Sequence, residues 1–336
     1  MAVTVGLRMV AGGLDLYTGL IAIMLAPEVY APVREVGKFF HASADGLSAS
    51  QSAFEILETP PATTGDNPAP NLEETTITIK DLGMRSRGAW APNAVNLVIQ
   101  PATITALVGK SGEGKTTTVM ALLKQLSSDR GTITLTDASG KTLNLDEVSP
   151  DSWWEQTSWL PQMPLLLPGT LAQNIAESPA HLAELFPQGS PGEQVRKAAR
   201  LAGFEEVVAK LPEGWDTFLR AGGEGLSVGQ RQRLALVRAL LSTKQLIALD
   251  EPSAHLDAHL VAQVAQVVQQ LKDSGKTVVL IAHRKELAQI ADQVVRISSA
   301  PFTPEETEKY RDTQPEAARA SEAEIPEFLG STRGLE

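Results

Sequence analysis

The N-terminal part of the chain begins with a long apolar stretch. The segment from Met9 to Pro27 carries a single charge, that of Asp15, over nineteen residues. As one helix it would measure about 28 Å, which is close to the hydrocarbon thickness of a bilayer. We therefore expect a membrane span at about 9–27, in which Asp15 faces protein or a cavity and not lipid.

Two other interpretations of this stretch remain open. A signal peptide requires a basic start and a cleavage site of small residues. Here Arg8 is the only early base, and Pro27 follows Ala26 directly. The second alternative is a buried amphipathic helix, because Asp15 and the glycines lower the hydropathy of the stretch.

The next segment, 28–58, repeats apolar side chains at helical spacing. Pro27 and Pro32 predict either the start of this helix or kinks in it. The helix would pack on its own domain or leave the membrane into the cytosol, and in the second case 1–58 is the C-terminal part of a membrane domain. The apolar positions that define the pattern are Val33, Val36, Phe39, Phe40, Leu47, Ala53, Phe54 and Leu57.

Changes in composition separate three further segments. Residues 59–73 contain four prolines and almost no apolar side chains, which is typical of a linker. Residues 74–299 alternate strand-like and helix-like runs, which predicts an α/β domain. Residues 300–336 are rich in proline and glutamate and predict an acidic, mostly disordered tail.

Overall composition excludes several classes of protein. With 336 residues and 43% hydrophobic side chains, the chain has room for one large or two modest globular domains. The absence of cysteine excludes disulfides, thiolate zinc sites and cysteine nucleophiles. A formal net charge of −11 argues against nucleic acid as a partner.

A glycine-rich loop between a predicted strand and a predicted helix carries the clearest chemistry. A β-rich run at 103–108 leads into 109–116, of the form G-x-x-x-x-G-K-T, and a helical run follows at 117–126. Glycines let successive backbone N–H groups surround a polyphosphate, and the helix N-terminus adds free donors and its dipole. Lys115 would reach the outer phosphates, and Thr116 would offer its hydroxyl to Mg²⁺. The predicted contacts with ATP are Gly109, Lys110, Ser111, Gly112, Glu113, Gly114, Lys115, Thr116 and Thr117.

Two more motifs gain meaning in combination with this loop. The buried-strand pattern at 246–249 ends in Asp250 and Glu251, and ligands bind at the carboxyl ends of parallel strands. Asp250 can hold Mg²⁺ there, and Glu251 can polarise a water that attacks the γ-phosphate. Residues 225–233 open a helix with Ser227 as a good N-cap. This is either a capped helix without a ligand or a second anion site.

The content and order of these motifs resemble the ATPases of the ATP-binding cassette (ABC) family. The resemblance covers about 74–299, with a helical subdomain at about 163–240. Leu-Ser-Val-Gly-Gln at 226–230 is similar to the family signature, in which glycine usually stands at the place of Val228. The glutamine that senses Mg²⁺, the D-loop and the switch histidine are matched by Gln162, residues 253–257 and His283.

This resemblance implies a fold and a mechanism. The fold is a P-loop ATPase domain with a mixed-sheet core and a helical subdomain, preceded by a membrane and cytosolic helical arm. Two such domains meet head to tail, and each ATP lies between the glycine loop of one and the signature of the other. The implied residues are Lys115, Glu251 and His283 for catalysis, Thr116, Gln162 and Asp250 for Mg²⁺, Gln162 and Asp257 for ATP, and Ser227, Gly229 and Gln230 for the partner's ATP.

Finer similarities point to exporters. Residues 169–175 resemble the exporter pattern that follows the glutamine, and 25–37 resemble CydD-type subunits of the thiol exporters that support cytochrome bd assembly. The resemblance implies an inner-membrane (plasma-membrane) subunit with a cytoplasmic ATPase domain. Such a subunit exports cysteine or glutathione as a heterodimer with a second ABC half-transporter subunit. Alternatives are an exporter of lipid, drug or peptide, and a truncated ATPase that transports nothing.

The sequence departs from the exporter pattern in three places. Many relatives stack adenine on an aromatic residue where Ser86 or Arg87 stands here, and Trp90 is either a substitute or a packing tryptophan. Ala221 stands near a glutamate that touches the partner in many exporters. Exporter subunits of this type have several membrane helices, of which the last is complete here, and 1–7 would end the preceding one.

Overall fold

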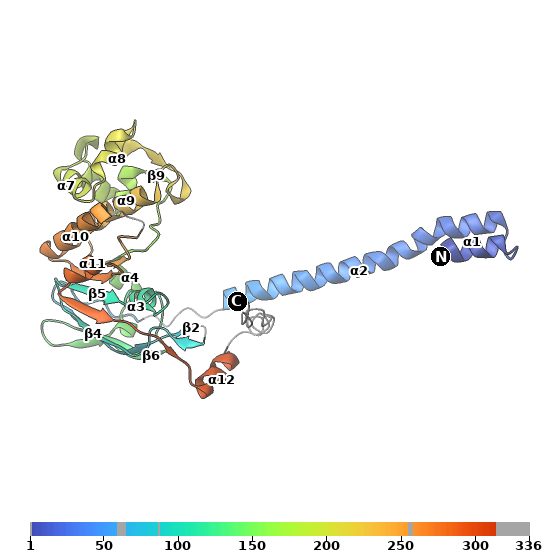
Figure 1. Cartoon of the computed structure of the whole chain (residues 1–336), viewed down its shortest axis with the longest axis horizontal. Coiled ribbons are helices and arrows are strands. Elements are labelled where there is room, and N and C mark those ends of the chain that lie inside the picture. The colour runs from blue at the N-terminus through green and yellow to red at the C-terminus, as the bar shows by residue number, and fades with distance from the viewer. Residues whose placement is uncertain (1, 59–64, 87, 255–257, 314–336) are drawn as a thin grey trace, which may run out of the picture. The chain divides into compact units, whose positions relative to one another are not determined.

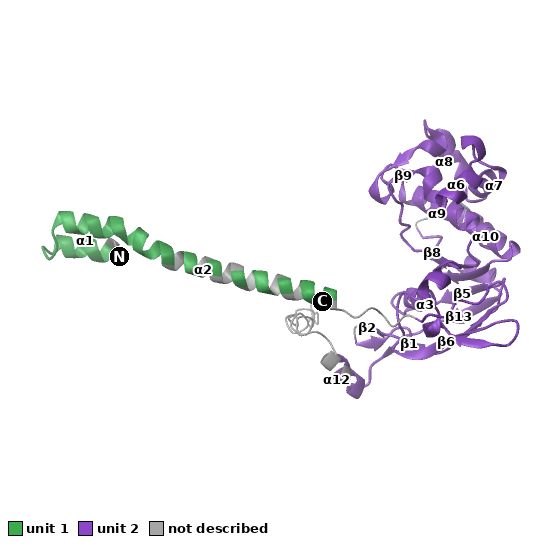
Figure 2. Cartoon of the chain, turned by 180° about the vertical axis from the view of Figure 1, so that it is seen from behind, with its two compact units in different colours: residues 1–62 green, residues 63–336 purple. Residues whose placement is uncertain are grey.

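The computed structural model describes residues 2–58, 65–86, 88–254 and 258–313 of the chain. It divides into two compact units, Met1–Ala62 and Thr63–Glu336 (Figure 2). The first unit holds the predicted helical arm, and the second holds the predicted α/β domain.

The first unit is a helical hairpin. Helix α1 (Ala2–Val10) is joined to helix α2 (Leu16–Glu58) by a turn in which Gly12 has a φ of +70°. Asp15 caps α2, because its carboxylate accepts the backbone N–H of Thr18 at 3.0 Å and the Thr18 hydroxyl at 2.6 Å. The turn and the cap together end one helix and begin the next.

The hairpin differs from the expected single helix at 9–27. The glycines and the capping Asp15 turn the chain there, and Asp15 binds its own helix end. No helix in the described part of the chain has the length and the apolar character that crossing a bilayer requires. Pro27 and Pro32 lie inside α2 and do not begin or end it. Gly19 faces α1, since an added Cβ would lie 2.3 Å from Met9 Sδ.

The second unit contains a parallel sheet in the strand order β13–β5–β12–β11–β8. Strands β11 and β12 are buried at every residue, as expected for parallel strands that are covered on both faces. The strands are β5 (Ile104–Val108), β8 (Thr157–Leu160), β11 (Leu246–Asp250), β12 (Thr277–Ile281) and β13 (Gln293–Arg296).

An antiparallel sheet in the order β4–β1–β6–β7 packs over the parallel one. Its strands are β1 (Thr76–Gly83), β4 (Val95–Ile99), β6 (Arg130–Thr136) and β7 (Thr142–Asn144). The core between the sheets also takes in α3 (Lys115–Leu122) and α4 (Pro150–Trp154). Trp153 of α4 is fully buried and donates from Nε1 to the carbonyl oxygen of Leu122 at 3.1 Å.

A group of helices lies on one side of the two sheets (Figure 1), and its core includes residues of the parallel sheet. These helices share a second core with α10 (Ala258–Asp273) and α11 (Lys285–Gln289). The group comprises α5 (Leu171–Ile175), α6 (Pro179–Leu185), α7 (Glu193–Leu201), α8 (Glu205–Lys210), α9 (Val228–Leu241) and the antiparallel pair of β9 (Gly169–Thr170) and β10 (Phe218–Leu219). Single-turn 3₁₀ helices lie at Leu145–Glu147, Pro187–Gly189, Gly214–Asp216 and Ala221–Gly223. The predicted α/β fold with a helical subdomain is confirmed.

The folded domain extends beyond the predicted limits of 74–299. At its start, Leu72 is 2% exposed and donates its backbone N–H to Gln156 Oε1 at 3.0 Å. The part of the expected linker after residue 64 therefore packs on the domain, because it finds partners far away in sequence. Residues 59–64 lie outside the described part of the chain.

The C-terminal side is also longer than predicted. The first residues of the expected disordered tail form strand β14 (Ala300–Pro301) and helix α12 (Pro304–Thr313). Strand β14 joins β3 (Ala89–Trp90) and β2 (Arg85–Ser86) in a small sheet of order β14–β3–β2. Residues 314–336 lie outside the described residues.

Candidate nucleotide-binding site

The glycine loop connects β5 to α3 at the carboxyl end of the parallel sheet. Gly112 and Gly114 have φ angles of +82° and +89°, which lie in the left-handed region that favours glycine. An added Cβ on Gly114 would lie 2.1 Å from the backbone nitrogen of Pro92. The loop is therefore in direct backbone contact with the segment that follows β3.

Lys115 begins α3 and is 5% exposed. Its Nζ donates to the carbonyl oxygens of Gly109 at 3.1 Å and Lys110 at 2.8 Å. Glu113 lies across the same turn and accepts the backbone N–H of Lys110. The buried ammonium group thus lies over the loop on neutral acceptors, which anionic phosphate oxygens can replace with stronger hydrogen bonds.

A hydroxyl and a carboxylate meet beside this loop. Thr116 Oγ1 donates to Asp250 Oδ2 at 2.8 Å. Burial raises the pKa of Asp250 above its usual value, and the hydrogen bond from Thr116 opposes this shift. The predicted pairing of the two residues is present, because α3 starts next to the end of β11.

Glu251 lies at the centre of a second group. Its Oε2 accepts the Nε2 amide of Gln162 at 3.0 Å, and its Oε1 lies 2.7 Å from His283 Nε2. The three residues follow the neighbouring strands β8, β11 and β12, which brings them together across the sheet edge. Glu251 has a φ of +49°, a conformation that a non-glycine residue rarely adopts and that often marks a functional turn.

Two hollows, each of about 280 Å³, flank the glycine loop. The first hollow is lined mostly by residues that the motifs predicted, and Ser86 and Ala91 of the β2–β3 region complete its wall. It is lined by Ser111, Gly112, Gly114, Lys115, Thr116, Thr117, Gln162, Glu251, Ser86 and Ala91. Ser86 was placed near the base by the resemblance, whereas Ala91 was missed, because an alanine in a short hairpin gives no sequence signal.

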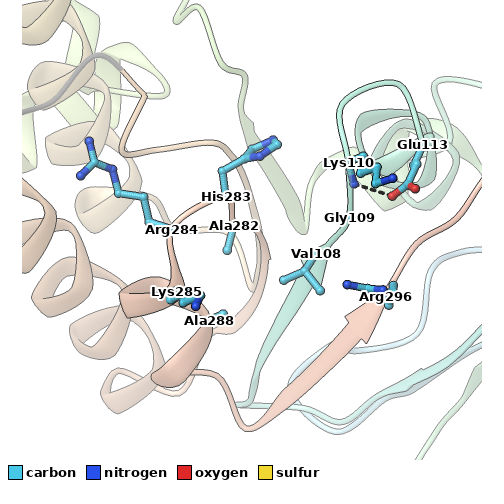
Figure 3. A pocket seen from close by; sticks show the side chains of 10 residues that line it. All are labelled: Val108, Gly109, Lys110, Glu113, Ala282, His283, Arg284, Lys285, Ala288 and Arg296. Atoms are coloured by element: carbon cyan, nitrogen blue, oxygen red, sulfur yellow. Dashed lines mark hydrogen bonds between the residues drawn. The ribbon is translucent and has the colours of Figure 1, made fainter.

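The second hollow lies between the glycine loop and the turn that follows β12 (Figure 3). Gly109, Lys110, Glu113 and His283 line it, and all four were predicted. The remaining lining residues are Val108, Ala282, Arg284, Lys285, Ala288 and Arg296, which the sequence motifs did not identify. Most of the charged side chains here are basic, which suits an anion next to the loop.

The predicted signature residues are not brought to either hollow. Ser227 caps α9 by accepting the backbone N–H of Gln230 at 3.3 Å, and the Gln230 side chain accepts the backbone N–H of Ser227 at 2.8 Å. Gly229 follows in the first turn of this helix. The predicted N-cap at Ser227 is therefore present, which leaves open whether this helix start also binds an anion. Asp257 of the D-loop lies outside the described residues.

Trp90 is a packing tryptophan and not a lining residue of the hollows. Its side chain is 8% exposed and its Nε1 donates to Glu306 Oε1 at 3.1 Å. Of the two interpretations of Trp90, its burial and this hydrogen bond favour the packing tryptophan. The C-terminal segment covers the indole instead.

Comparisons with known proteins agree with this geometry. Residues 92–254 match the sequence profile of the family described as ABC transporter. The chain is 32% identical over 277 residues to the glutathione/L-cysteine transport system ATP-binding/permease protein CydD of Escherichia coli, covering 82% of this chain and 45% of the relative. It is 31% identical to CydC of the corresponding Bacillus subtilis system, covering 88% of this chain and 49% of the relative.

Other relatives carry other cargo names. An ATP-dependent lipid A-core flippase of Saccharophagus degradans is 29% identical, with 88% of this chain and 48% of the relative covered. A bacterial Atm1-family ABC exporter solved with ATP bound has the same fold, with a TM-score of 0.60 and 21% identity, over 91% of this chain and 51% of that chain.

The chain spans about half the length of the curated relatives that it matches. The matched region includes the glycine loop, the Asp250–Glu251 pair and the signature helix α9. With these motifs on the described fold, the chain carries an ATPase domain of the ABC transporter family and belongs to that family.

Proposed function

We propose that the first hollow, which is lined by Lys115, Thr116, Gln162 and Glu251 and is called the ATP hollow below, binds ATP and that Glu251 directs its hydrolysis. The observation that carries this proposal is the meeting of Gln162, Glu251 and His283 next to the Thr116–Asp250 pair. Five side chains from four separate segments of the chain converge on the place where the outer phosphates would lie. A glycine loop that binds no ligand would not require these five side chains to meet beside it.

In the proposed reaction, Lys115 leaves the carbonyl oxygens of its own loop and binds the outer phosphates. Glu251 accepts a hydrogen bond, and then the proton, from the water that attacks the γ-phosphate. Gln162 and His283 hold both oxygens of that carboxylate, which fixes its direction. His283 is 40% exposed and can also turn towards the γ-phosphate.

Mg²⁺ fits the residues at this site. The Thr116 hydroxyl and the Asp250 carboxylate are adjacent oxygen donors, and Mg²⁺ is usually bound by one or two carboxylates, substrate phosphates and waters. Within the described residues, no group of three His, Asp or Glu side chains could hold a metal unaided. The ion would neutralise phosphate charge during the transfer, and Gln162 is the third proposed ligand.

The signature helix supports a head-to-tail dimer. Ser227 and Val228 are exposed, and neither of them lines one of the chain's own two hollows. Free backbone N–H groups at the N-terminus of this 14-residue helix suit an anion. We therefore infer that Ser227, Gly229 and Gln230, with Asp257, act on the ATP of a second ABC subunit.

Release of phosphate from Mg-ATP tests the proposed activity. The chain, purified in detergent with its membrane partner, is expected to turn over ATP. The Lys115→Ala variant is expected to bind ATP weakly and release no phosphate. Equal release by the two proteins would contradict the role of the glycine loop.

As the cargo, we propose cysteine or glutathione, exported with a second ABC half-transporter subunit for cytochrome bd assembly. The names of the CydD and CydC relatives and the resemblance at 25–37 support this. Helix α2 exposes large apolar side chains, including Leu16 at 66%, Met24 at 71% and Val29 at 68%. Such a surface suits a membrane or the rest of a membrane domain. From the resemblance to exporter subunits, we propose that the ATPase domain lies on the cytoplasmic side of the inner membrane.

ATP-driven uptake into inverted membrane vesicles discriminates between the cargoes. Accumulation of labelled glutathione or cysteine that stops in the Lys115→Ala variant supports a thiol exporter. Movement of a labelled lipid without thiol uptake would favour the flippase alternative, for which a relative at 29% identity gives support. Hydrolysis without transport of either would favour a non-transporting ATPase.

A further inference from the structure

The C-terminal segment packs against the hairpin that walls the ATP hollow. Strand β14 pairs with β3, with Ala300 opposite Trp90, and α12 follows beside the β2 hairpin (Figure 1). Phe302 donates its backbone N–H to the carbonyl oxygen of Gly88 at 3.2 Å. Residues 300–313 are therefore part of the folded domain, next to its nucleotide site.

Glu306 uses its two carboxylate oxygens for two different tasks. Oε2 accepts the backbone N–H of Thr303 at 2.8 Å and so caps the start of α12. Oε1 accepts the indole N–H of Trp90 at 3.1 Å. These two bonds lower the pKa of Glu306. One side chain thus joins the beginning of α12 to the hairpin.

Aromatic and basic side chains enclose the same indole. Phe302 contacts Trp90 edge-on, with 5.7 Å between ring centroids, and Tyr310 contacts Phe302 at 5.2 Å. The guanidinium carbon of Arg130 lies 4.7 Å from the centroid of the Trp90 ring. These contacts hold the Trp90 side chain on several sides.

Trp90 is connected to the glycine loop through the next two residues, Ala91 and Pro92. Ala91 follows Trp90, donates its backbone N–H to the Met84 carbonyl at 2.8 Å, and lines the ATP hollow. A Cβ on Gly114 would lie 2.3 Å from the carbonyl carbon of Ala91 and 2.1 Å from Pro92 N. The 91–92 backbone therefore forms the support on which the loop rests.

We propose that Trp90 is a positioning residue for the glycine loop and that the β14–α12 segment, through Glu306, sets the affinity of the site for nucleotide. The proposal rests on ATP binding at this loop. Release of the indole allows the 91–92 backbone to move away from Gly114. The loop then holds its N–H groups less well aligned to the phosphates, which weakens binding without touching Glu251 or His283.

The test measures ATP binding and steady-state turnover in the full chain with its partner. Trp90→Phe removes the indole N–H and retains an aromatic ring, and Glu306→Ala removes the acceptor. Both are expected to raise the Kd and the KM for ATP by about 3- to 10-fold, with kcat within about twofold of the wild type. The matched control is Glu308→Ala, because Glu308 is exposed on the same helix.

Each outcome decides a different point. A Kd in Trp90→Phe and Glu306→Ala equal to that of Glu308→Ala would overturn the positioning role. A fall in kcat at constant KM would also overturn it, because that result indicates general damage to the domain. Failure of the wild-type chain to bind ATP would instead contradict the proposed function. If Glu306→Ala does not fold, the conservative Trp90→Phe variant still decides.

Discussion

Replacement of Gly114 by alanine tests the contact between the glycine loop and the 91–92 backbone. Gly112 provides the matched control, because both glycines have left-handed backbones, with φ of +82° at Gly112 and +89° at Gly114. Their surroundings differ. A Cβ on Gly112 meets no atom within 4 Å, whereas on Gly114 it would lie 2.1 Å from Pro92 N.

The magnitudes follow from these two environments. In either variant the left-handed backbone costs an alanine about 1–2 kcal/mol. At Gly114 the overlap adds about 1–3 kcal/mol, because its nearest neighbours are backbone atoms that cannot rotate away. If the loop moves to relieve the overlap, the same energy appears as ATP affinity lowered by about 5- to 150-fold relative to Gly112→Ala.

Urea denaturation and equilibrium ATP binding measure the two variants side by side. Gly114→Ala is expected to lose more stability, more ATP affinity, or both, than Gly112→Ala. Equal losses in both measurements would refute the inference that the 91–92 backbone supports the loop. A larger loss in Gly112→Ala would contradict the described loop geometry itself.

Two further predictions concern buried groups. Asp250→Asn should raise the free energy of unfolding near neutral pH without Mg²⁺, because burial raises the pKa of Asp250 above its usual 3.8 and penalises the ionised form. The gain in unfolding free energy of the variant over the wild type should shrink as the pH falls through the raised pKa of Asp250, and vanish below 3.8. A gain that stays constant when urea unfolding is repeated across this pH range would contradict the prediction. Trp153→Phe should cost about 2–4 kcal/mol in urea unfolding, since the indole is fully buried and bonded to Leu122; a loss below about 1 kcal/mol would contradict that burial.

The part of the site that the sequence predicted depends on short motifs with fixed local geometry. The glycine loop fixes where Lys115 and Thr116 lie, and adjacent parallel strands bring Gln162, Glu251 and His283 to one edge. Each of these residues stands at the end of a strand or the start of a helix. The motifs predict that each residue lies at the carboxyl edge of the sheet, and the strand order β12–β11–β8 then places Gln162, Glu251 and His283 side by side.

The features that were missed depend on contacts between distant residues. Glu306 and Trp90 are 216 positions apart, and neither belongs to a motif. The acidic composition of the C-terminal residues therefore predicted disorder where helix α12 packs on the domain. Leu72 was assigned to a linker because its neighbours are polar, yet Gln156 binds its backbone. The hydropathy of residues 9–27 likewise did not predict the turn in this stretch, because hydropathy carries no information on the cap that Asp15 forms at the start of α2.

The Glu251→Gln variant tests the central claim most directly, that this carboxylate directs hydrolysis of ATP held by the glycine loop. The amide retains the size of the side chain and an acceptor, but it cannot take a proton. Binding and turnover of Mg-ATP are measured on the same preparation. The account predicts unchanged ATP binding with turnover reduced by about 100-fold or more. Turnover equal to that of the wild type would contradict it.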